Sequence, residues 1–236
     1  MTLRTLLVLG TAALAVVAGV TSTDLVRVSA PDDRAAAGLS RSSSATWVPS
    51  GTLKRVDAIE LDAESITLRD GRRTVAVVSM RDARTTVRVL TRLLGTPSRT
   101  QTAEGDGGRC FPASTTSTWG GAVRVAALAT PSALGNSVEV RVLRDDVRTR
   151  TGAVVELQGP HGVQVGDDVE HRIEHADSDD RESLGSDDAE AWQVLLEEGW
   201  PSDRRGAGTN GVSALTDDTT VTVIGSPMPV HATRGC

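Results

Sequence analysis

Two apolar runs joined by Asp70-Gly71 constrain the fold more than any other part of the chain. Residues 65–69 and 73–79 are rich in β-branched side chains, and Asp-Gly between two such runs is typical of a two-residue hairpin turn. We therefore expect an antiparallel pair of strands at residues 65–79. An antiparallel sheet is the expected framework of the domain.

Residues 82–94 (DARTTVRVLTRLL) predict the best-defined helix of the chain. Asp82 suits the N-cap, and Gly95 and Pro97 are typical stop signals after the last turn. The apolar side chains of this stretch recur at helical spacing, at Val87, Leu90, Leu93 and Leu94. A hairpin followed by a helix predicts an α+β fold in which the helix packs on an antiparallel sheet.

The remaining apolar runs predict further strands and a second, weaker helix. The expected strands cover residues 119–129, 138–143, 153–157, 191–196 and 219–224, and the short helix covers residues 166–173. Strand, turn, helix, polar loop and strands follow one another in both halves, with an offset of about 85 residues. We expect two tandem α/β repeats, the first at 51–145 and a divergent second at 146–236.

The composition limits both the core and the partners. Apolar residues make up 39% of the 236 residues but aromatic residues only 2%, so the core must consist mainly of Val, Leu, Ala and Ile. The net charge is −6, and Lys54 is the only lysine beside many arginines. A mildly acidic chain without a basic stripe interleaved with aromatic residues lacks the electrostatic pattern of a nucleic-acid binder.

The N-terminal 24 residues predict export. Arg4 precedes residues 5–20, an uncharged run with the length of a signal-peptide core or a short membrane span. Both outcomes stay open: a cleaved signal peptide, or an anchor that holds the protein to the membrane through residues 5–20. Residues 25–50, rich in Ser, Ala and Pro, are expected to form a flexible tether. The expected location is extracytoplasmic, either secreted or membrane-anchored.

Export changes the interpretation of the two cysteines. Cys110 and Cys236 are an even number in an oxidising compartment, which favours a disulfide between them. Two free thiols or an intermolecular bridge are the alternatives.

One stretch also resembles known proteins. Residues 80–125 contain a helix that ends in L-G-x-P, then Cys110, then Trp119-Gly120-Gly121. This pattern resembles exported, largely uncharacterised proteins of high-GC Gram-positive bacteria. The order of elements also looks like the small α/β repeat of the beta-lactamase inhibitor proteins and of the SmpA/OmlA lipoproteins. The resemblance implies a helix on an antiparallel sheet and a binding or envelope role, but no reaction.

The pentapeptide HRIEH matches the H-x-x-E-H signature of one class of zinc peptidases. By that resemblance His171 and His175 would bind the metal and Glu174 would activate water. The third ligand would have to come from Glu190, Glu197 or Glu198. The flanks of the motif are acidic and almost free of apolar residues, which favours a solvated acidic helix.

Two other motifs are also more typical of loops than of a calcium site or a dinucleotide-binding site. Residues 177–182 cluster carboxylates that could suit Ca²⁺, but they lack the spacing of an EF-hand loop. Residues 206–211 match G-x-G-x-x-G but are not followed by a helix, so a loop is expected.

The expected function is therefore a non-enzymatic binding or envelope protein with a protein or cell-wall partner. We assign it no catalytic residue, no metal and no cofactor. The alternative hypothesis is a metal-dependent hydrolase that uses His171, Glu174 and His175.

Overall fold

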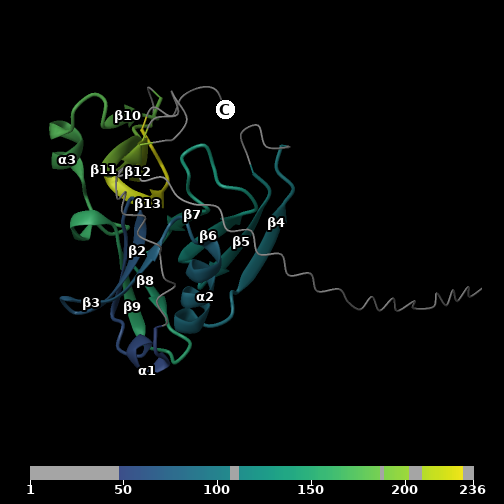
Figure 1. Cartoon of the computed structure of the whole chain (residues 1–236). Coiled ribbons are helices and arrows are strands. Elements are labelled where there is room, and N and C mark those ends of the chain that lie inside the picture. Colours follow the sequence, from purple (N-terminus) through teal and green to yellow (C-terminus); the bar gives the residue numbers. More distant parts are fainter. Residues whose placement is uncertain (1–47, 107–111, 187–188, 202–208, 231–236) are drawn as a thin grey trace, which may run out of the picture. The chain divides into compact units, whose positions relative to one another are not determined.

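The computed structural model describes residues 48–106, 112–186, 189–201 and 209–230, all of which belong to one compact unit, Ser43–Cys236 (Figure 1). These residues form two β-sheets, three α-helices and one 3₁₀ helix. The helices are α1 (Ser50–Leu53), α2 (Ala83–Leu94), η1 (Pro160–Gly162) and α3 (Glu170–His175). The α+β class predicted from the sequence is confirmed.

The smaller sheet has five strands in the order β3-β2-β1-β9-β8. The strands are β1 (Ala58–Leu61), β2 (Ser65–Asp70), β3 (Arg73–Ser79), β8 (Asp146–Arg148) and β9 (Val154–Gln158). The predicted hairpin is confirmed, because β2 and β3 pair antiparallel across a turn in which Gly71 has a φ of 56°. β1 pairs antiparallel with β2 on one side and parallel with β9 on the other.

The larger sheet has eight antiparallel strands in the order β10-β11-β12-β13-β7-β6-β5-β4. The strands are β4 (Arg99–Ala103), β5 (Ser114–Trp119), β6 (Val123–Leu128), β7 (Val138–Val142), β10 (Arg181–Ser183), β11 (Trp192–Pro201), β12 (Thr209–Asp217) and β13 (Thr220–Ser226). In β7 the burial alternates, with Val138, Val140 and Val142 on the inner face.

The predicted helix over residues 82–94 is α2, and its N-cap is also confirmed. The Asp82 carboxylate accepts a hydrogen bond of 2.9 Å from the Thr85 backbone N–H. Partial burial pushes the pKa of Asp82 upward, but the hydrogen bonds from Thr85 and the charges of Arg88 and Arg84 outweigh it. The pKa of this carboxyl therefore lies below its ordinary value.

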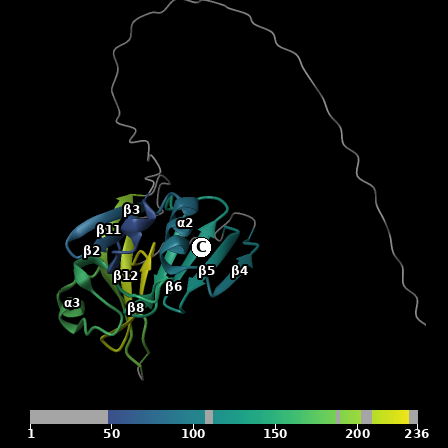
Figure 2. The same cartoon turned by 90° about the horizontal axis from the view of Figure 1, so that it is seen from below.

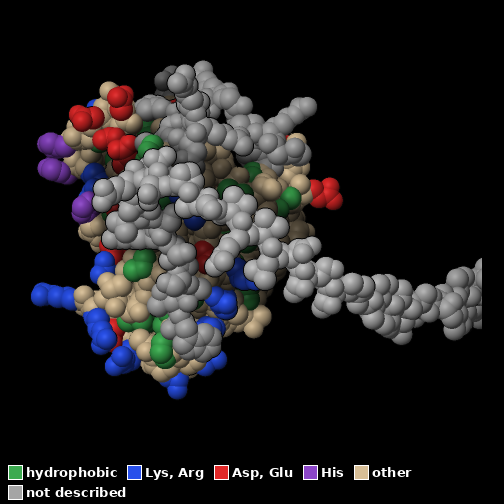
Figure 3. All heavy atoms as spheres, in the orientation of Figure 1, with side chains coloured by type: hydrophobic (Ala, Val, Ile, Leu, Met, Phe, Trp, Pro, Cys, Tyr) green, Lys and Arg blue, Asp and Glu red, His purple; other side chains and the backbone are tan. Residues whose placement is uncertain are grey.

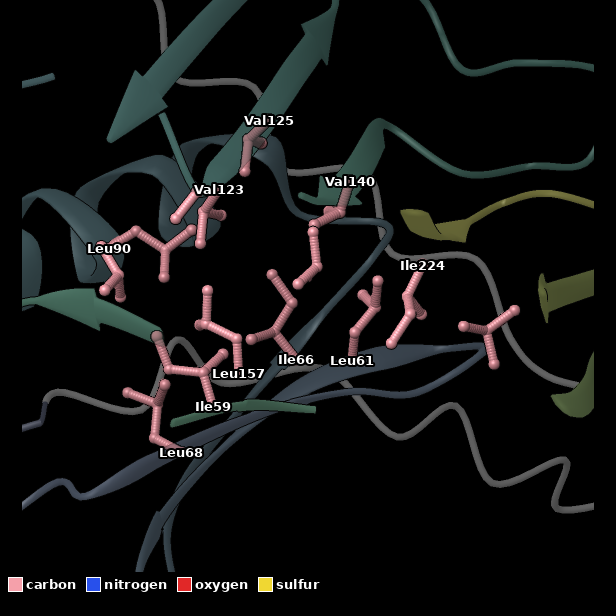
Figure 4. Close-up of a cluster of buried hydrophobic side chains, with 14 of the residues drawn as sticks. Ile59, Leu61, Ile66, Leu68, Leu90, Val123, Val125, Val140, Leu157 and Ile224 are labelled. Atoms are coloured by element: carbon pink, nitrogen blue, oxygen red, sulfur yellow. The ribbon is translucent and has the colours of Figure 1, made fainter. Parts of the chain in front are cut away.

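The helix α2 contacts β3 of the smaller sheet and β6 of the larger one, and it lies beside β6 in both views (Figures 1 and 2). The core fills the space between these elements. In Figure 4, side chains of the smaller sheet, of the larger sheet and of α2 point toward one another: Ile59, Leu61, Ile66, Leu68 and Leu157, then Val123, Val125, Val140 and Ile224, with Leu90. Aliphatic residues dominate this cluster, as the composition predicts, and Trp119 is its one fully buried aromatic side chain among the described residues.

The segment around Trp119 differs from the prediction. Residues 119–129 do not form one strand, because β5 ends at Trp119 and β6 begins at Val123. Trp119 pairs with Val123, so Gly120, Gly121 and Ala122 connect the two strands. The Ala122 backbone N–H donates to the Trp119 oxygen at 2.9 Å, and the central residues of this β-turn, Gly120 and Gly121, have φ angles of 57° and 67°, which glycine adopts at little cost. The W-G-G motif is thus a hairpin turn that joins two strands.

The two motifs that carry the resemblance to exported proteins are in contact. The indole Nε1–H of Trp119 donates a hydrogen bond of 2.9 Å to the backbone oxygen of Gly95, the residue after α2. Gly95 has a φ of 91°, a conformation that other residues adopt only with strain. The L-G-x-P end of the helix and the W-G-G turn therefore form one packing unit.

Both sheets take strands from each side of the predicted boundary between residues 145 and 146. β8 and β9 complete the sheet of β1, β2 and β3, and β13 pairs with β7. The halves share their sheets, and neither closes around a sheet of its own. A duplication origin for the halves stays a prediction.

The beginning of the domain also differs in detail from the prediction. Val48 is buried and Ser50 begins α1, so the last residues of the expected tether at 25–50 belong to the folded domain. The expected export segment at residues 5–20 lies outside the described residues. Within the described part of the chain, no helix is long and apolar enough to cross a membrane.

Candidate functional site

The HRIEH motif forms most of α3, a helix that the surrounding fold holds in place. Val169 and Ile173 are 6% and 5% exposed, which seats this short helix on the core. The Val169 backbone N–H donates to the Thr219 backbone oxygen. The Val169 backbone oxygen in turn accepts hydrogen bonds from the backbone N–H groups of Arg172 and Ile173. The helix therefore has a narrow apolar side despite its acidic flanks. A helix is present as predicted, but it begins at Glu170 and ends at His175, whereas the prediction covered residues 166–173.

Asp168 stabilises the first turn of α3 from outside. Its carboxylate accepts a hydrogen bond of 3.0 Å from the Glu170 backbone N–H. This bond, together with one from the Thr219 side chain, holds the pKa of Asp168 below its ordinary value. A carboxylate at this position also interacts favourably with the unpaired N–H groups at the helix start.

The two histidines lie together on the exposed side of α3. Their rings stack with centroids 4.1 Å apart and planes inclined by 16°. The His175 Nδ1 atom lies 2.8 Å from the His171 backbone oxygen, and since a carbonyl only accepts, this ring nitrogen carries the hydrogen. Figure 3 shows histidine side chains at the surface over α3, with acidic side chains beside them.

Each of the three candidates for the third metal ligand makes contacts elsewhere in the fold. Glu190 accepts a hydrogen bond of 2.8 Å from the indole Nε1–H of Trp192. Glu197 accepts one of 3.0 Å from the Ala63 backbone N–H, and Glu198 pairs with Gly211 in the sheet. Among the described residues, no group of three or more His, Cys, Asp or Glu side chains could hold a metal ion. The described residues therefore add nothing in favour of the hydrolase hypothesis.

The most distinctive property of this region is its charge. Residues 167–182, which we name the acidic segment, contain eight carboxylates and two arginines. This excess of six acids equals the net charge of −6 of the whole chain, so the remainder of the protein is neutral overall. Six of the eight carboxylate residues are exposed: Asp167, Asp168, Glu170, Glu174, Asp177 and Asp179.

The acidic segment is tied to the larger sheet at its second end. Arg181 begins β10, which pairs with β11, and its guanidinium donates to the Ile173 backbone oxygen. The same guanidinium lies 5.8 Å from the ring centre of Trp192. Arg181 thus joins the end of α3 to the sheet, a role that nothing in the local sequence indicated.

The carboxylate cluster at residues 177–182, which the sequence predicts as a solvated loop, is part of this connection. The Asp180 N–H donates to the Asp177 oxygen in a tight turn, and β10 follows directly. Leu195 on β11 donates its N–H to the Asp180 oxygen, which holds the turn against the sheet. The backbone of this acidic loop is therefore fixed, while Asp177 and Asp179 are exposed and Asp180 and Glu182 are half-buried.

The second half of the G-x-G-x-x-G match, residues 209–211, is part of strand β12. Residues 206–208 lie outside the described residues, whereas Asn210 and Gly211 lie inside β12 and are buried, not in the expected loop. The Asn210 amide donates to the Ala63 oxygen, which also accepts a hydrogen bond of 3.2 Å from Ser226. These bonds join the larger sheet to the turn after β1.

The tryptophans and the cysteines are the remaining residues singled out in the sequence. Trp119 is a core residue, whereas Trp192 and Trp200 are half-buried and pack against the core. Cys110 and Cys236 lie outside the described residues, so the expected disulfide stays a prediction.

Comparison of the chain with protein-family models, with curated proteins and with solved structures gives no match. The resemblance to exported proteins of high-GC Gram-positive bacteria therefore stays an expectation.

Proposed function

We propose that this chain is an exported or membrane-tethered binding protein without a catalytic role, and that it engages a protein partner with a basic surface through the acidic segment. The observation that carries the proposal is the concentration of the entire net charge in residues 167–182. The export part rests on the pattern of residues 1–24.

Charge concentrated in one place supports selective association. Complementary charges steer diffusional encounter and disfavour partners of the same sign. At physiological salt the field of an exposed charge is screened over about 8 Å, so charges must be close together to act as a group. Glu170 and Glu174 on α3 and Asp177 and Asp179 on the adjoining turn meet this condition through their proximity in the chain.

The acidic segment is also ordered before it meets a partner. Ile173 and Val169 seat α3 on the core, and Arg181 fixes its end to β11. A segment whose backbone is already fixed avoids the cost of ordering it on binding, about 1–2 kcal/mol per residue. The fixed backbone of the acidic segment thus supports a recognition role.

The test compares two variants of equal charge. The neutralised variant carries Glu170→Gln, Glu174→Gln, Asp177→Asn and Asp179→Asn, all exposed residues of the acidic segment. The control variant carries Glu64→Gln, Glu104→Gln, Asp145→Asn and Glu156→Gln, four exposed carboxylates outside the segment. Circular dichroism establishes that both variants fold.

Each immobilised chain is then incubated with an envelope extract of the producing organism, and the retained material is identified by mass spectrometry. We expect the wild-type chain and the control variant to retain the same basic protein in a salt-sensitive manner. The neutralised variant should retain several-fold less of it. Equal retention by both variants, or retention of cell-wall polymer in place of a protein, would contradict the proposed partner.

A further inference from the structure

A small basic pocket lies between α1, the end of α2 and the turn that joins β8 to β9, away from the acidic segment in the sequence. The volume of the pocket is about 40 Å³. Its polar lining comes from α1 and the residue that follows it, from α2, and from the turn between β8 and β9: Ser50, Lys54, Arg92, Thr149, Arg150 and Thr151. Leu53 and Leu93, both buried, complete its wall. In Figure 3, Lys and Arg side chains gather at the lower end of the view, where Figure 1 places α1 and β9.

Hydrogen bonds connect the three segments around the pocket. The Arg92 Nη2 atom donates to the Ser50 Oγ atom at 2.8 Å, which joins α2 to α1. The Arg150 backbone N–H donates to the Leu93 oxygen at 3.1 Å, which joins the turn to the end of α2. The hydroxyl oxygens of Thr149 and Thr151 lie 3.0 Å apart in the same turn. The pocket is therefore built by the fold and does not depend on one loop.

The electrostatics of the pocket favour an anion. Three of its residues carry a formal positive charge and none carries a negative one. The end of α2 contributes about half a negative charge through its carbonyl groups, and the Arg150 N–H already pairs with one of them. Three full charges outweigh this half charge.

We propose that this pocket binds a phosphate-type oxyanion. Guanidinium groups offer planar, paired donors that match phosphate oxygens, and an ammonium adds a compact charge. The threonine and serine hydroxyls can donate to the remaining oxygens. Since one buried water needs about 10–15 Å³ of such volume, the pocket has room for about three oxygen-sized groups. Three oxygens of a phosphate group therefore fit inside, and the fourth oxygen, with the rest of a larger ligand, lies at the mouth of the pocket.

The ligand chemistry has two sources: free inorganic phosphate and the headgroup of an anionic phospholipid. The pocket uses residues outside the acidic segment, so its binding does not depend on the proposed protein partner.

The only lysine of the chain gives a direct probe of the pocket, because Lys54 is one of its lining residues. The full chain is treated with an amine-acylating reagent, and mass spectrometry measures the acylation rate of Lys54 relative to the N-terminal amine. Phosphate is compared with chloride at equal ionic strength. We expect phosphate to slow Lys54 acylation by the factor 1 + [L]/Kd, about tenfold at about ten times the Kd.

Two variants with the same loss of charge separate the pocket from general electrostatics. Arg150→Gln removes a lining guanidinium but keeps the Cβ and the backbone N–H that pack against the end of α2. Arg72→Gln removes an exposed guanidinium that does not line the pocket. Protection of Lys54 should be lost in Arg150→Gln and retained in Arg72→Gln. Equal loss in the two variants would overturn the proposal.

Vesicles identify the source of the phosphate group. Phosphatidylcholine vesicles, whose phosphate is balanced by a quaternary ammonium group, control for insertion of residues 5–20. Vesicles that also contain phosphatidylglycerol present a phosphate with a net negative charge. Protection by phosphatidylglycerol alone supports a lipid headgroup, and protection by inorganic phosphate supports the free ion. Absence of protection by both would refute the site.

Discussion

Replacement of Trp119 by phenylalanine tests the contact between the end of α2 and the β5–β6 hairpin. Trp119 is 1% exposed, and its Nε1–H donates to the Gly95 oxygen at 2.9 Å. Phenylalanine keeps an aromatic ring on β5 but has no donor for this carbonyl and leaves part of the space empty. The substitution therefore removes both a buried hydrogen bond and packing volume.

The expected loss of stability has two parts. Removal of one partner of a buried hydrogen bond costs about 1–3 kcal/mol. A phenylalanine side chain is smaller by about 40 Å³, which at about 24 cal/mol per Å³ of cavity adds about 1 kcal/mol. Because Gly95 is only half-buried, water can reach part of this region, and the lower end of the range applies. We expect a decrease of about 2 kcal/mol in the free energy of unfolding.

Urea unfolding of the full chain, followed by far-UV circular dichroism, measures this loss. With a slope of about 2–3 kcal/mol per M, the midpoint should fall by about 1 M. Trp192→Phe is the matched control, because the indole of Trp192 is half-buried and donates to the exposed Glu190. The control should lose less than about 1 kcal/mol. Equal losses in the two variants would refute the assigned role of Trp119.

Two further predictions concern α2. Gly95→Ala should lower the free energy of unfolding by about 1–3 kcal/mol, because the residue has a φ of 91° and an added Cβ would lie 3.2 Å from the Arg150 Cβ; an unchanged urea midpoint would contradict this. Asp82→Asn should destabilise the chain by less than about 1 kcal/mol at neutral pH. Because the folded-state pKa of Asp82 is lowered, its charge stabilises the fold above the unfolded pKa near 3.8 and loses this effect as the pH falls through the folded pKa. The difference between wild type and Asp82→Asn should therefore disappear in acid, and a difference that persists there would exclude a contribution from the charge.

Local signals made α2 and the β2–β3 hairpin predictable. The Asp82 cap, the Gly95 stop and the Asp70-Gly71 signal each act within a few residues of the element that they limit, although the turn itself consists of Gly71 and Arg72 because Asp70 pairs with Arg73. No comparable signal marked β4 and β5. β5 consists of Ser and Thr before its tryptophan, and all five residues of β4 are exposed, so neither strand shows an apolar alternation.

Contacts between distant segments explain what the sequence could not predict at the two charged surfaces. The acidic segment itself is visible in the sequence, but Arg181 fixes it through contacts with Ile173 and Trp192 that only the fold creates. The basic pocket combines Lys54, Arg92 and Arg150 from three separate segments. No spacing rule relates such residues, because their proximity depends on the sheet order.

The parallel pairing of β1 with β9 has a consequence for the order of folding. Ala58 pairs with Glu156, so β1 obtains its second neighbour only when residues near 156 are present. During synthesis from the N-terminus, the first half therefore lacks the strand that closes its sheet. Pairings this distant in sequence are typical of slow folding. A fragment that ends at residue 145 should leave one edge of β1 unpaired, and such edges promote association between chains. The smaller sheet can therefore be completed only after the second half of the chain has been synthesised.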